Sequence, residues 1–136
     1  MELTYTTKKL ISVENYVDLI SSTSLKDRRP LNDYERIEQM LKNATLTVTA
    51  WDGNELVGIA RSVTDFAYCC YVSDLAVRGA YQKKGIGKKL LQITKDNIHN
   101  NAKIILLAAP QAEEYYSHIG FEKHKAAFVS SGVFVI

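Results

Sequence analysis

A glycine-bearing, lysine-rich stretch, YQKKGIGKKLL at residues 81–91, follows an almost unbroken apolar run and opens a segment with helical apolar spacing. Such a loop gathers free backbone N–H groups beside the positive end of a helix dipole, which suits an anion. Glycine at 85 and 87 would let a bulky phosphate approach the backbone without meeting a Cβ. A plain strand–helix turn with solvated lysines fits the same stretch. Two glycines alone do not decide between these interpretations.

Two familiar phosphate motifs fail on this stretch. The Walker pattern requires a glycine at 82 and Ser or Thr at 89, where the sequence has Gln82 and Lys89. The dinucleotide pattern requires a third glycine at 90, where the sequence has Leu90. Neither fingerprint is therefore present.

The pattern that does match is Gln/Arg-x-x-Gly-x-Gly/Ala, at residues 82–87, preceded by Asp74-Leu-Ala-Val77. It resembles the acetyl-CoA pyrophosphate loop of the GNAT superfamily of N-acetyltransferases. A second stretch, Tyr115-Tyr-Ser-His-Ile-Gly-Phe121, is similar to that superfamily's second signature, an aromatic pair followed by Gly-Phe. Two motifs in the right order make the resemblance specific. It extends over the whole chain, with the N-terminal third matched by pattern alone.

The resemblance implies an acetyl-CoA site and indicates its residues. The pantetheine arm would pair, as an extra strand would, with Leu75, Ala76 and Val77, and one N–H there would polarise the thioester carbonyl. The pyrophosphate would lie against the backbone of Gln82, Lys83, Lys84, Gly85, Ile86, Gly87 and Lys88. Amides and the helix dipole supply the positive potential, so no metal is expected.

The resemblance also suggests groups that move protons. Tyr116 stands four residues before Gly120, where relatives often have a tyrosine that protonates the departing CoA thiolate; an aromatic core residue is the alternative. Asp74 is the best-placed carboxylate to take a proton from the attacking amine, but pairing with a lysine or capping a turn is about as compatible with its position, and a water chain would then be the base. Many relatives have an Asn where this chain has Ala109, and Gln111 is the candidate to replace that cofactor contact.

The elements that must position these residues follow from apolar spacing, capping residues and turns. The sequence predicts four helices: residues 12–22, capped by Ser12; from Asn32 or Asp33 to 43; 86–100; and 111–118, ended by Gly120. It predicts a hairpin over 45–63 and buried strands over 68–77 and 103–108. One or two closing strands are predicted within 121–136. The strand–helix–strand units imply right-handed crossovers. We therefore expect an α/β fold: one domain, residues 1–136, with a mixed sheet and helices on both faces.

Composition narrows the class of protein. A chain of 136 residues, 46% apolar and 24% charged, suits one globular domain, and a net charge of +2 is too small to indicate a nucleic-acid partner. No apolar run approaches the ~20 residues of a membrane span, and the N-terminus lacks a secretory signal, so we expect a cytoplasmic protein with no membrane partner. The adjacent Cys69 and Cys70 cannot form an ordinary disulfide, and the three histidines lack metal-ligand spacing.

The expected activity is transfer of an acetyl group from acetyl-CoA to a primary amine of a small molecule or peptide, by direct nucleophilic attack. The alternative is a non-catalytic acyl-CoA-binding or regulatory module of the same fold. Acceptor specificity is expected from the loop over 21–31 and the strand ends around 61–66. Arg28 and Arg29 could bind an anionic acceptor or the cofactor's 3′-phosphate, or be solvated charges. A short C-terminal strand at 133–136 is compatible with a homodimer.

Overall fold

A computed structural model describes residues 2–134 of the chain. The chain forms two compact units, Met1–Leu106 and Leu107–Ile136. The larger unit contains the whole β-sheet and most of the helices, and the smaller unit contains one short helix followed by an irregular segment.

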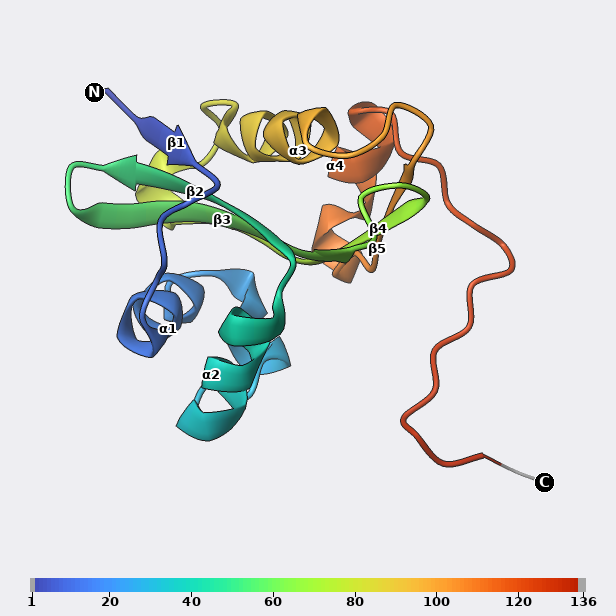
Figure 1. The fold of residues 1–136 in the computed structure, drawn as a ribbon, viewed down its shortest axis with the longest axis horizontal. Helices are drawn as coiled ribbons and strands as arrows, with labels where there is room; N and C mark the ends of the chain where they lie inside the picture. The colour runs from blue at the N-terminus through green and yellow to red at the C-terminus, as the bar shows by residue number, and fades with distance from the viewer. Residues whose placement is uncertain (1, 135–136) are drawn as a thin grey trace. The chain divides into compact units, whose positions relative to one another are not determined.

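The larger unit is built on a five-stranded sheet in the order β1-β2-β3-β4-β5 (Figure 1). Its strands are β1 (Thr4–Thr6), β2 (Leu46–Asp52), β3 (Glu55–Thr64), β4 (Cys69–Val77) and β5 (Lys103–Leu106). The first four strands pair antiparallel, and β4 pairs with β5 in parallel. Between β2 and β3 the turn is made by Gly53, whose φ of 60° lies in the left-handed region that glycine tolerates.

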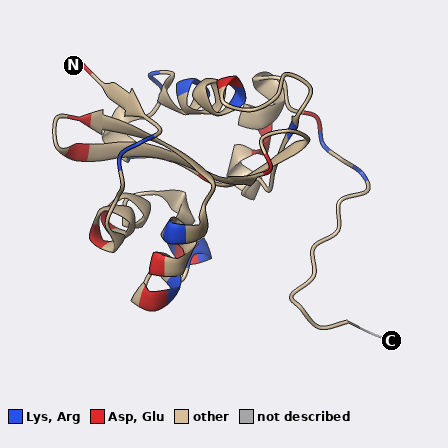
Figure 2. Ribbon diagram, in the orientation of Figure 1, with Lys and Arg blue, Asp and Glu red and all other residues tan. Residues whose placement is uncertain are grey.

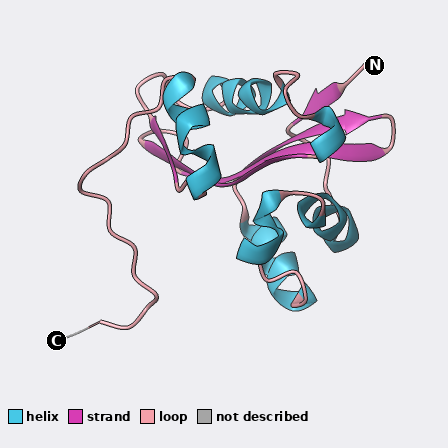
Figure 3. Ribbon diagram, turned by 180° about the vertical axis from the view of Figure 1, so that it is seen from behind, coloured by secondary structure: helices cyan, strands magenta, loops and turns pink. Residues whose placement is uncertain are grey.

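Helices cover both faces of this sheet, as the reversed view of Figure 3 also shows. On one face lie α1 (Val13–Ser21) and α2 (Tyr34–Asn43), joined through the 3₁₀ helix η1 (Ser24–Arg28). On the other face lies α3 (Ile86–Asp96), which follows the 3₁₀ turn η2 (Gly79–Tyr81). The mixed sheet between two helical layers confirms the predicted fold class.

Capping explains where the first two helices begin. The side chain of Ser12 accepts a hydrogen bond from the N–H of Asn15, whose own side chain reaches back to the N–H of Ser12, which makes a capping box. The carboxylate of Asp33 accepts from the N–H of Arg36 and caps α2. Ser12 is therefore the cap that was predicted, and Asp33, of the two predicted candidates, caps the second helix.

The core is split by the sheet into two layers. Between the sheet and the helices α1 and α2, eight buried side chains form one cluster: Tyr16, Leu19, Ile20, Ile37, Trp51, Leu56, Ile59 and Ala76. On the other face α3 packs so closely that a Cβ at Gly58 of β3 would lie 3.1 Å from Cδ1 of Leu90 and 3.3 Å from Cγ2 of Ile86. This close approach fixes the start of α3 against the centre of the sheet.

The smaller unit contains the 3₁₀ turn η3 (Pro110–Ala112) and helix α4 (Glu113–His118). Helix α4 is followed by Gly120, which has a φ of 107°, and the N–H of Phe121 donates to the carbonyl of Tyr116 at 2.9 Å. Gly120 therefore ends the helix in the left-handed conformation that its position predicted.

Three elements differ from the prediction. The strand β1 was not predicted, because three residues are too short to show alternation. The buried strand predicted over 103–108 ends at Leu106, and Ile105 is half-exposed rather than buried. Helix α3 ends at Asp96, and not near 100, because the chain caps at Asn97.

The closing strands predicted within 121–136 are also not found: residues 121–134 contain no strand, and residues 135–136 lie outside the described part. Apolar side chains such as Phe128, which is 94% exposed, have no surface to pack on, and alternation without packing does not make a strand. None of the helices over residues 2–134 is long and apolar enough to cross a membrane.

Candidate active site

Strand β4 pairs with β5 over only half of its length. Cys69–Val72 pair with Lys103–Leu106, whereas Asp74–Val77 have β3 as their one strand partner within residues 2–134. The register against β3 shifts between Arg61 and Ser62, which leaves Ser73 as an extra residue in β4. The two parallel strands therefore separate at Val72, beside a bulge, and the second half of β4 has an edge that no strand of the described residues covers.

The backbone orientation shows which groups lie on that edge. The N–H of Arg78 donates to the carbonyl of Val57 in β3 at 2.8 Å, so the carbonyl of Val77, in the same trans peptide plane, points away from β3. Alternate residues of an antiparallel strand present their backbone groups to the same edge, so the N–H and C=O of Leu75 also face away from β3. Ala76 instead presents its backbone to β3 and its side chain to the core.

Two side chains hold the loop that follows β4. Arg78 donates through Nε and Nη2 to the carbonyl of Leu56, at 3.2 and 2.9 Å, and through Nη2 to Asp18 at 2.9 Å. Tyr81 donates its hydroxyl to Asp52 at 2.6 Å, with Glu55 at 3.2 Å. The hydrogen bond to Asp52, with burial adding to it, raises the pKa of Tyr81 to about 12. The loop is thus fastened to the β2–β3 hairpin at its first turn.

The turn into α3 depends on two left-handed residues. Lys83 has a φ of 63°, which is uncommon outside glycine, and Gly85 has a φ of 81° at the N-cap position of α3. No side chain caps this helix, so the first N–H groups of α3 are not taken up by a capping oxygen. A Cβ placed on Gly85 would meet nothing within 4 Å, so the space in front of these groups is open.

The remaining loop residues have less specific positions. Lys83, Lys84 and Lys88 are exposed, and Figure 2 shows basic residues on the loop and along α3. The side-chain amide of Gln82 donates to the carbonyl of Val77 at 2.9 Å, which ties the loop back to the open edge. Ile86 is buried and packs against the sheet, so it can offer only its backbone to a ligand.

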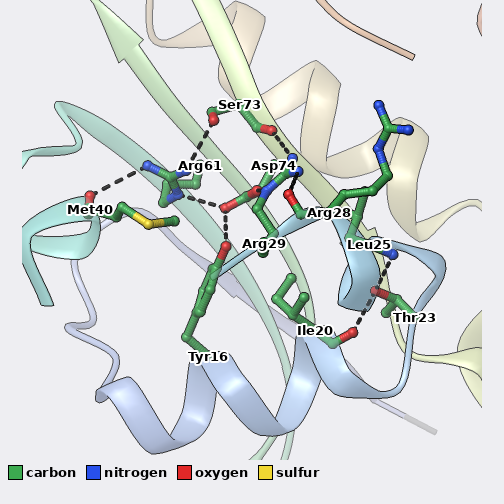
Figure 4. Close-up of polar contacts among 10 residues, drawn as sticks. All are labelled: Tyr16, Ile20, Thr23, Leu25, Arg28, Arg29, Met40, Arg61, Ser73 and Asp74. Carbon is green, nitrogen blue, oxygen red and sulfur yellow. Dashed lines mark hydrogen bonds and ion pairs between the residues drawn. The ribbon is translucent and has the colours of Figure 1, made fainter. Parts of the chain in front are cut away.

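A buried carboxylate lies in the same strand, on the face covered by α1 and α2. Asp74 has no exposed surface, and Figure 4 shows three donors that converge on it. Its Oδ2 accepts from the Tyr16 hydroxyl at 2.7 Å and from Nε of Arg61 at 2.6 Å, and its Oδ1 accepts from Nε of Arg29 at 2.5 Å. Asp74 therefore joins α1, β3 and the α1–α2 loop to β4.

The same donors reach the bulge next to Asp74. Nη2 of Arg29 donates to the backbone carbonyl of Ser73 at 2.6 Å, and Nη2 of Arg61 donates to the hydroxyl of Ser73 at 3.0 Å. Burial and the Asp74 carboxylate raise the pKa of Tyr16 well above its usual value, so Tyr16 stays protonated and donates. Burial alone would lower the pKa of Arg29, but the Asp74 carboxylate more than offsets it, so the pKa is raised.

This geometry speaks against Asp74 as a free base. Both carboxylate oxygens already accept charge-assisted or phenolic hydrogen bonds, two of them from guanidinium groups. The carboxylate is ion-paired, as in the structural alternative, although its partners are arginines rather than a lysine. Arg61 and Tyr16 were not predicted to take part. The only sequence signal for this ion pair was that two neighbouring apolar strands each contain a charged residue, Arg61 in β3 and Asp74 in β4.

Tyr116 and Gln111 lie in the smaller unit. Tyr116 is in α4, half-buried, with its ring centroid 5.4 Å from that of Tyr115 and 5.5 Å from that of Phe121, both edge-on. Burial, with Tyr115 adding to it, raises the pKa of Tyr116 above its usual value. Gln111 is exposed in η3, and Glu113 forms an ion pair with Lys123 at 2.6 Å.

Within residues 2–134, no group of three or more His, Cys, Asp or Glu side chains comes together as a metal site. Cys69 and Cys70 are both free thiols, and Cys70 is buried. The buried Cys70 therefore packs as a small apolar group, whereas Cys69 is partly exposed.

Known proteins resemble the chain in both sequence and fold. The family described as an acetyltransferase (GNAT) domain matches residues 20–136. An uncharacterised N-acetyltransferase, ycf52, of Gracilaria tenuistipitata var. liui is 30% identical over 122 residues, which cover 82% of this chain and 65% of that protein. A histone acetyltransferase, TAP1, of Glycine max is 32% identical over 111 residues, covering 70% of this chain and 46% of that protein. The chain thus spans less than two thirds of the length of these relatives.

The fold is shared with solved acetyltransferase structures. A probable acetyltransferase from meticillin-resistant Staphylococcus aureus aligns with a TM-score of 0.75 at 23% identity, covering 99% of both chains. An aminoglycoside acetyltransferase, meta-AAC0020, from a soil metagenomic sample, in complex with sisomicin, aligns with a TM-score of 0.69 at 20% identity, covering 95% of both chains. With the family match over residues 20–136, these findings show that the chain belongs to the GNAT acetyltransferase family.

Proposed function

We propose that this chain transfers an acetyl group from acetyl-CoA to a primary amine of a small molecule or peptide. Family membership supports acyl transfer in general. The observation that carries the finer proposal is the uncovered edge of β4, which ends at an uncapped, glycine-bearing helix start. An edge strand followed by free amides fits a ligand with an amide-containing arm and a phosphate group, which is the chemical composition of CoA.

The residues fit this co-substrate in two places. The outward-facing N–H and C=O groups of Leu75 and the outward-facing N–H of Val77 would pair with the amides of the pantetheine arm. The carbonyl of Val77 already accepts from the Gln82 side chain, and Ala76 holds the strand against β3. The amides from Gln82 to Lys88 would hold the pyrophosphate, with Gly85 leaving the space that a Cβ would fill and Lys83, Lys84 and Lys88 adding charge. Gln111 is the proposed contact from η3.

Acetyl-CoA supplies the activated acetyl thioester, and the chain's groups orient it and handle the protons. A backbone N–H on the open edge of β4 would polarise the thioester carbonyl. The pKa of Tyr116 lies above the ordinary value for tyrosine, which is itself well above neutral pH, so the hydroxyl is protonated and would donate its proton to the departing thiolate. Asp74 is already occupied, so we assign removal of the amine proton to water.

The acceptor, the location and the oligomeric state stay predictions. The sequence predicts a cytoplasmic location and is compatible with a homodimer. Relatives named as a histone acetyltransferase and as an aminoglycoside acetyltransferase motivate peptide amines and aminoglycosides as test acceptors, with polyamines and amino acids added for breadth.

The test is CoA release from acetyl-CoA over that panel of amines, together with thermal unfolding in the presence of acetyl-CoA. We expect turnover with at least one amine class and a raised midpoint. Saturable binding with no CoA release from any amine would instead support the non-catalytic acyl-CoA-binding module. No thermal stabilisation at saturating acetyl-CoA would sink both.

The role of Tyr116 is tested by Tyr116→Phe. Loss of a general acid lowers kcat by about 10²–10⁴-fold, and the affinity for acetyl-CoA should be unchanged. Tyr115→Phe is the matched control, since it lies next in the same helix and also loses only a hydroxyl. Equal kcat values for the two variants would show that Tyr116 is not the acid.

A further inference from the structure

The loop between α1 and α2 (residues 22–33) has little apolar anchoring of its own. The 3₁₀ helix within it contains no buried residue, and only Leu25 and Leu31 pack partly against the core beneath α1 and α2. Thr23 caps the 3₁₀ helix, which fixes its start and not its position on the sheet. A segment with so few buried contacts is expected to open locally unless polar contacts hold it.

Arg29 supplies those polar contacts. Its guanidinium donates to Asp74 through Nε at 2.5 Å, to the carbonyl of Arg28 through Nη1 at 2.8 Å, and to the carbonyl of Ser73 through Nη2 at 2.6 Å. The side chain is 19% exposed, and its carboxylate partner is fully buried. A charge-assisted bond to a buried carboxylate is stronger than an exposed ion pair.

The contact point lies where the two parallel strands separate. Ser73 directly follows Val72, the last residue of β4 that pairs with β5, and comes two residues before Leu75. Arg29 therefore fastens the loop to β4 beside the backbone that is proposed to hold the thioester. An amine that attacks a thioester must lie within about 3–3.5 Å of its carbonyl carbon, so a segment held here borders its approach.

Resting on the proposed function, we propose that Arg29 is a positioning residue that holds the α1–α2 loop in the conformation that binds the acceptor amine. Asp74 is its buried anchor, and Arg61 and Tyr16 keep that carboxylate in place. Arg29 itself does not bind the acceptor through its Nε, because Asp74 occupies it.

Arg29 can be removed without leaving Asp74 uncompensated. The cluster contains one carboxylate and two guanidinium groups, so Arg29→Ala leaves Asp74 paired with Arg61 and hydrogen-bonded to Tyr16. The neighbouring Arg28 is exposed, and its backbone carbonyl, not its side chain, takes part in the cluster. Arg28→Ala is therefore the matched control, with the same loss of charge one residue away.

The experiment measures steady-state kinetics and amide hydrogen exchange on the full chain. For Arg29→Ala we expect faster exchange across residues 22–33, a KM for the amine raised by about tenfold or more, and a KM for acetyl-CoA within about twofold of wild type. Arg29→Lys retains the positive charge but not the planar set of guanidinium donors, so its exchange rates and its KM for the amine should lie between those of wild type and Arg29→Ala. Arg28→Ala should match wild type in exchange.

Three results would overturn the proposal. The first is unchanged amide exchange in Arg29→Ala, and the second is faster exchange in Arg29→Ala with an unchanged KM for the amine. The third is an equal rise in exchange and in the amine KM in Arg28→Ala. Wild-type protein that releases no CoA with any amine overturns the proposed function instead, and is recognised before the variants are compared. The hydrogen-exchange comparison then still decides whether Arg29 holds the loop.

Discussion

The uncovered half of β4 makes its contacts through a side chain at Asp74 and through the backbone in the residues that follow. At Asp74 the side chain acts: it is buried, and groups from α1, β3 and the α1–α2 loop occupy it. At Leu75 and Val77, and again at Gly85, the backbone acts: its groups face an open edge and then an uncapped helix start. The first region holds the fold together, and the second leaves hydrogen-bonding groups free for a ligand.

The contrast teaches that a charged residue beside a site is not thereby part of the chemistry. Asp74 directly precedes Leu75, the first residue on the open edge, yet both of its carboxylate oxygens are held in hydrogen bonds to other parts of the chain. Gly85 carries no functional side chain, yet its conformation leaves the space that a phosphate needs. Breaking Asp74 should therefore affect stability first, and changing Gly85 should affect cofactor binding first.

The largest expected effect is on stability, from Asp74→Asn. The amide keeps the shape of the side chain but leaves the buried guanidinium of Arg61 and the partly buried guanidinium of Arg29 without a carboxylate, so the free energy of unfolding should fall by about 3–5 kcal/mol. Chemical denaturation measures this fall. Asp18→Asn is the control, since Asp18 pairs with Arg78 while 73% exposed, and its loss should cost no more than about 1 kcal/mol. Equal losses in the two variants would contradict the structural role of Asp74.

The next effect separates binding from stability, by comparing Gly85→Ala with Gly53→Ala. Both glycines have positive φ and open space around a Cβ, so each substitution should cost about 1–2 kcal/mol of stability. Only Gly85→Ala places a methyl group in the proposed phosphate site, and its Kd for acetyl-CoA should rise by about tenfold or more. Calorimetric titration measures the Kd values. If Gly53→Ala weakened acetyl-CoA binding equally, the phosphate site would not be at Gly85.

The smallest effect is a pH dependence, from Tyr81→Phe. The folded-state pKa of Tyr81 is about 12, above its ordinary value of 10.0, so its hydrogen bonds stabilise the protein below pH 10 and are lost as the pH rises through 12. The stability of wild type should therefore fall more steeply over this range than that of Tyr81→Phe. Denaturation at a series of pH values tests this. Parallel curves would mean that Tyr81 does not fasten the loop.

Much of the fold could be predicted because its signals are local. Ser12 and Asp33 are residue types that cap helices, and each comes just before a run with helical spacing. Gly53 and Gly120 indicate turns because glycine tolerates a positive φ. The loop proposed to bind phosphate was predicted in the same way, since glycine spacing indicates backbone conformation. Short elements such as β1 have no such signal, because three residues show no period.

The side-chain network could not be predicted, because its members are far apart in sequence. Tyr16 and Asp74 are separated by 58 positions, and Arg29 and Asp74 by 45. The face on which Asp74 points depends on the bulge at Ser73, and strand alternation alone cannot show an extra residue. The role of Asp74 was therefore decided by tertiary structure.

The most direct test of the central claim is site-resolved amide hydrogen exchange with and without acetyl-CoA. If the open edge of β4 and the following loop bind the co-substrate, exchange should slow at Leu75, at Val77 and across residues 82–88. Ala76 should change least, since its backbone already faces β3. Slowed exchange elsewhere, with no change at Leu75, Val77 and the loop, would contradict the account.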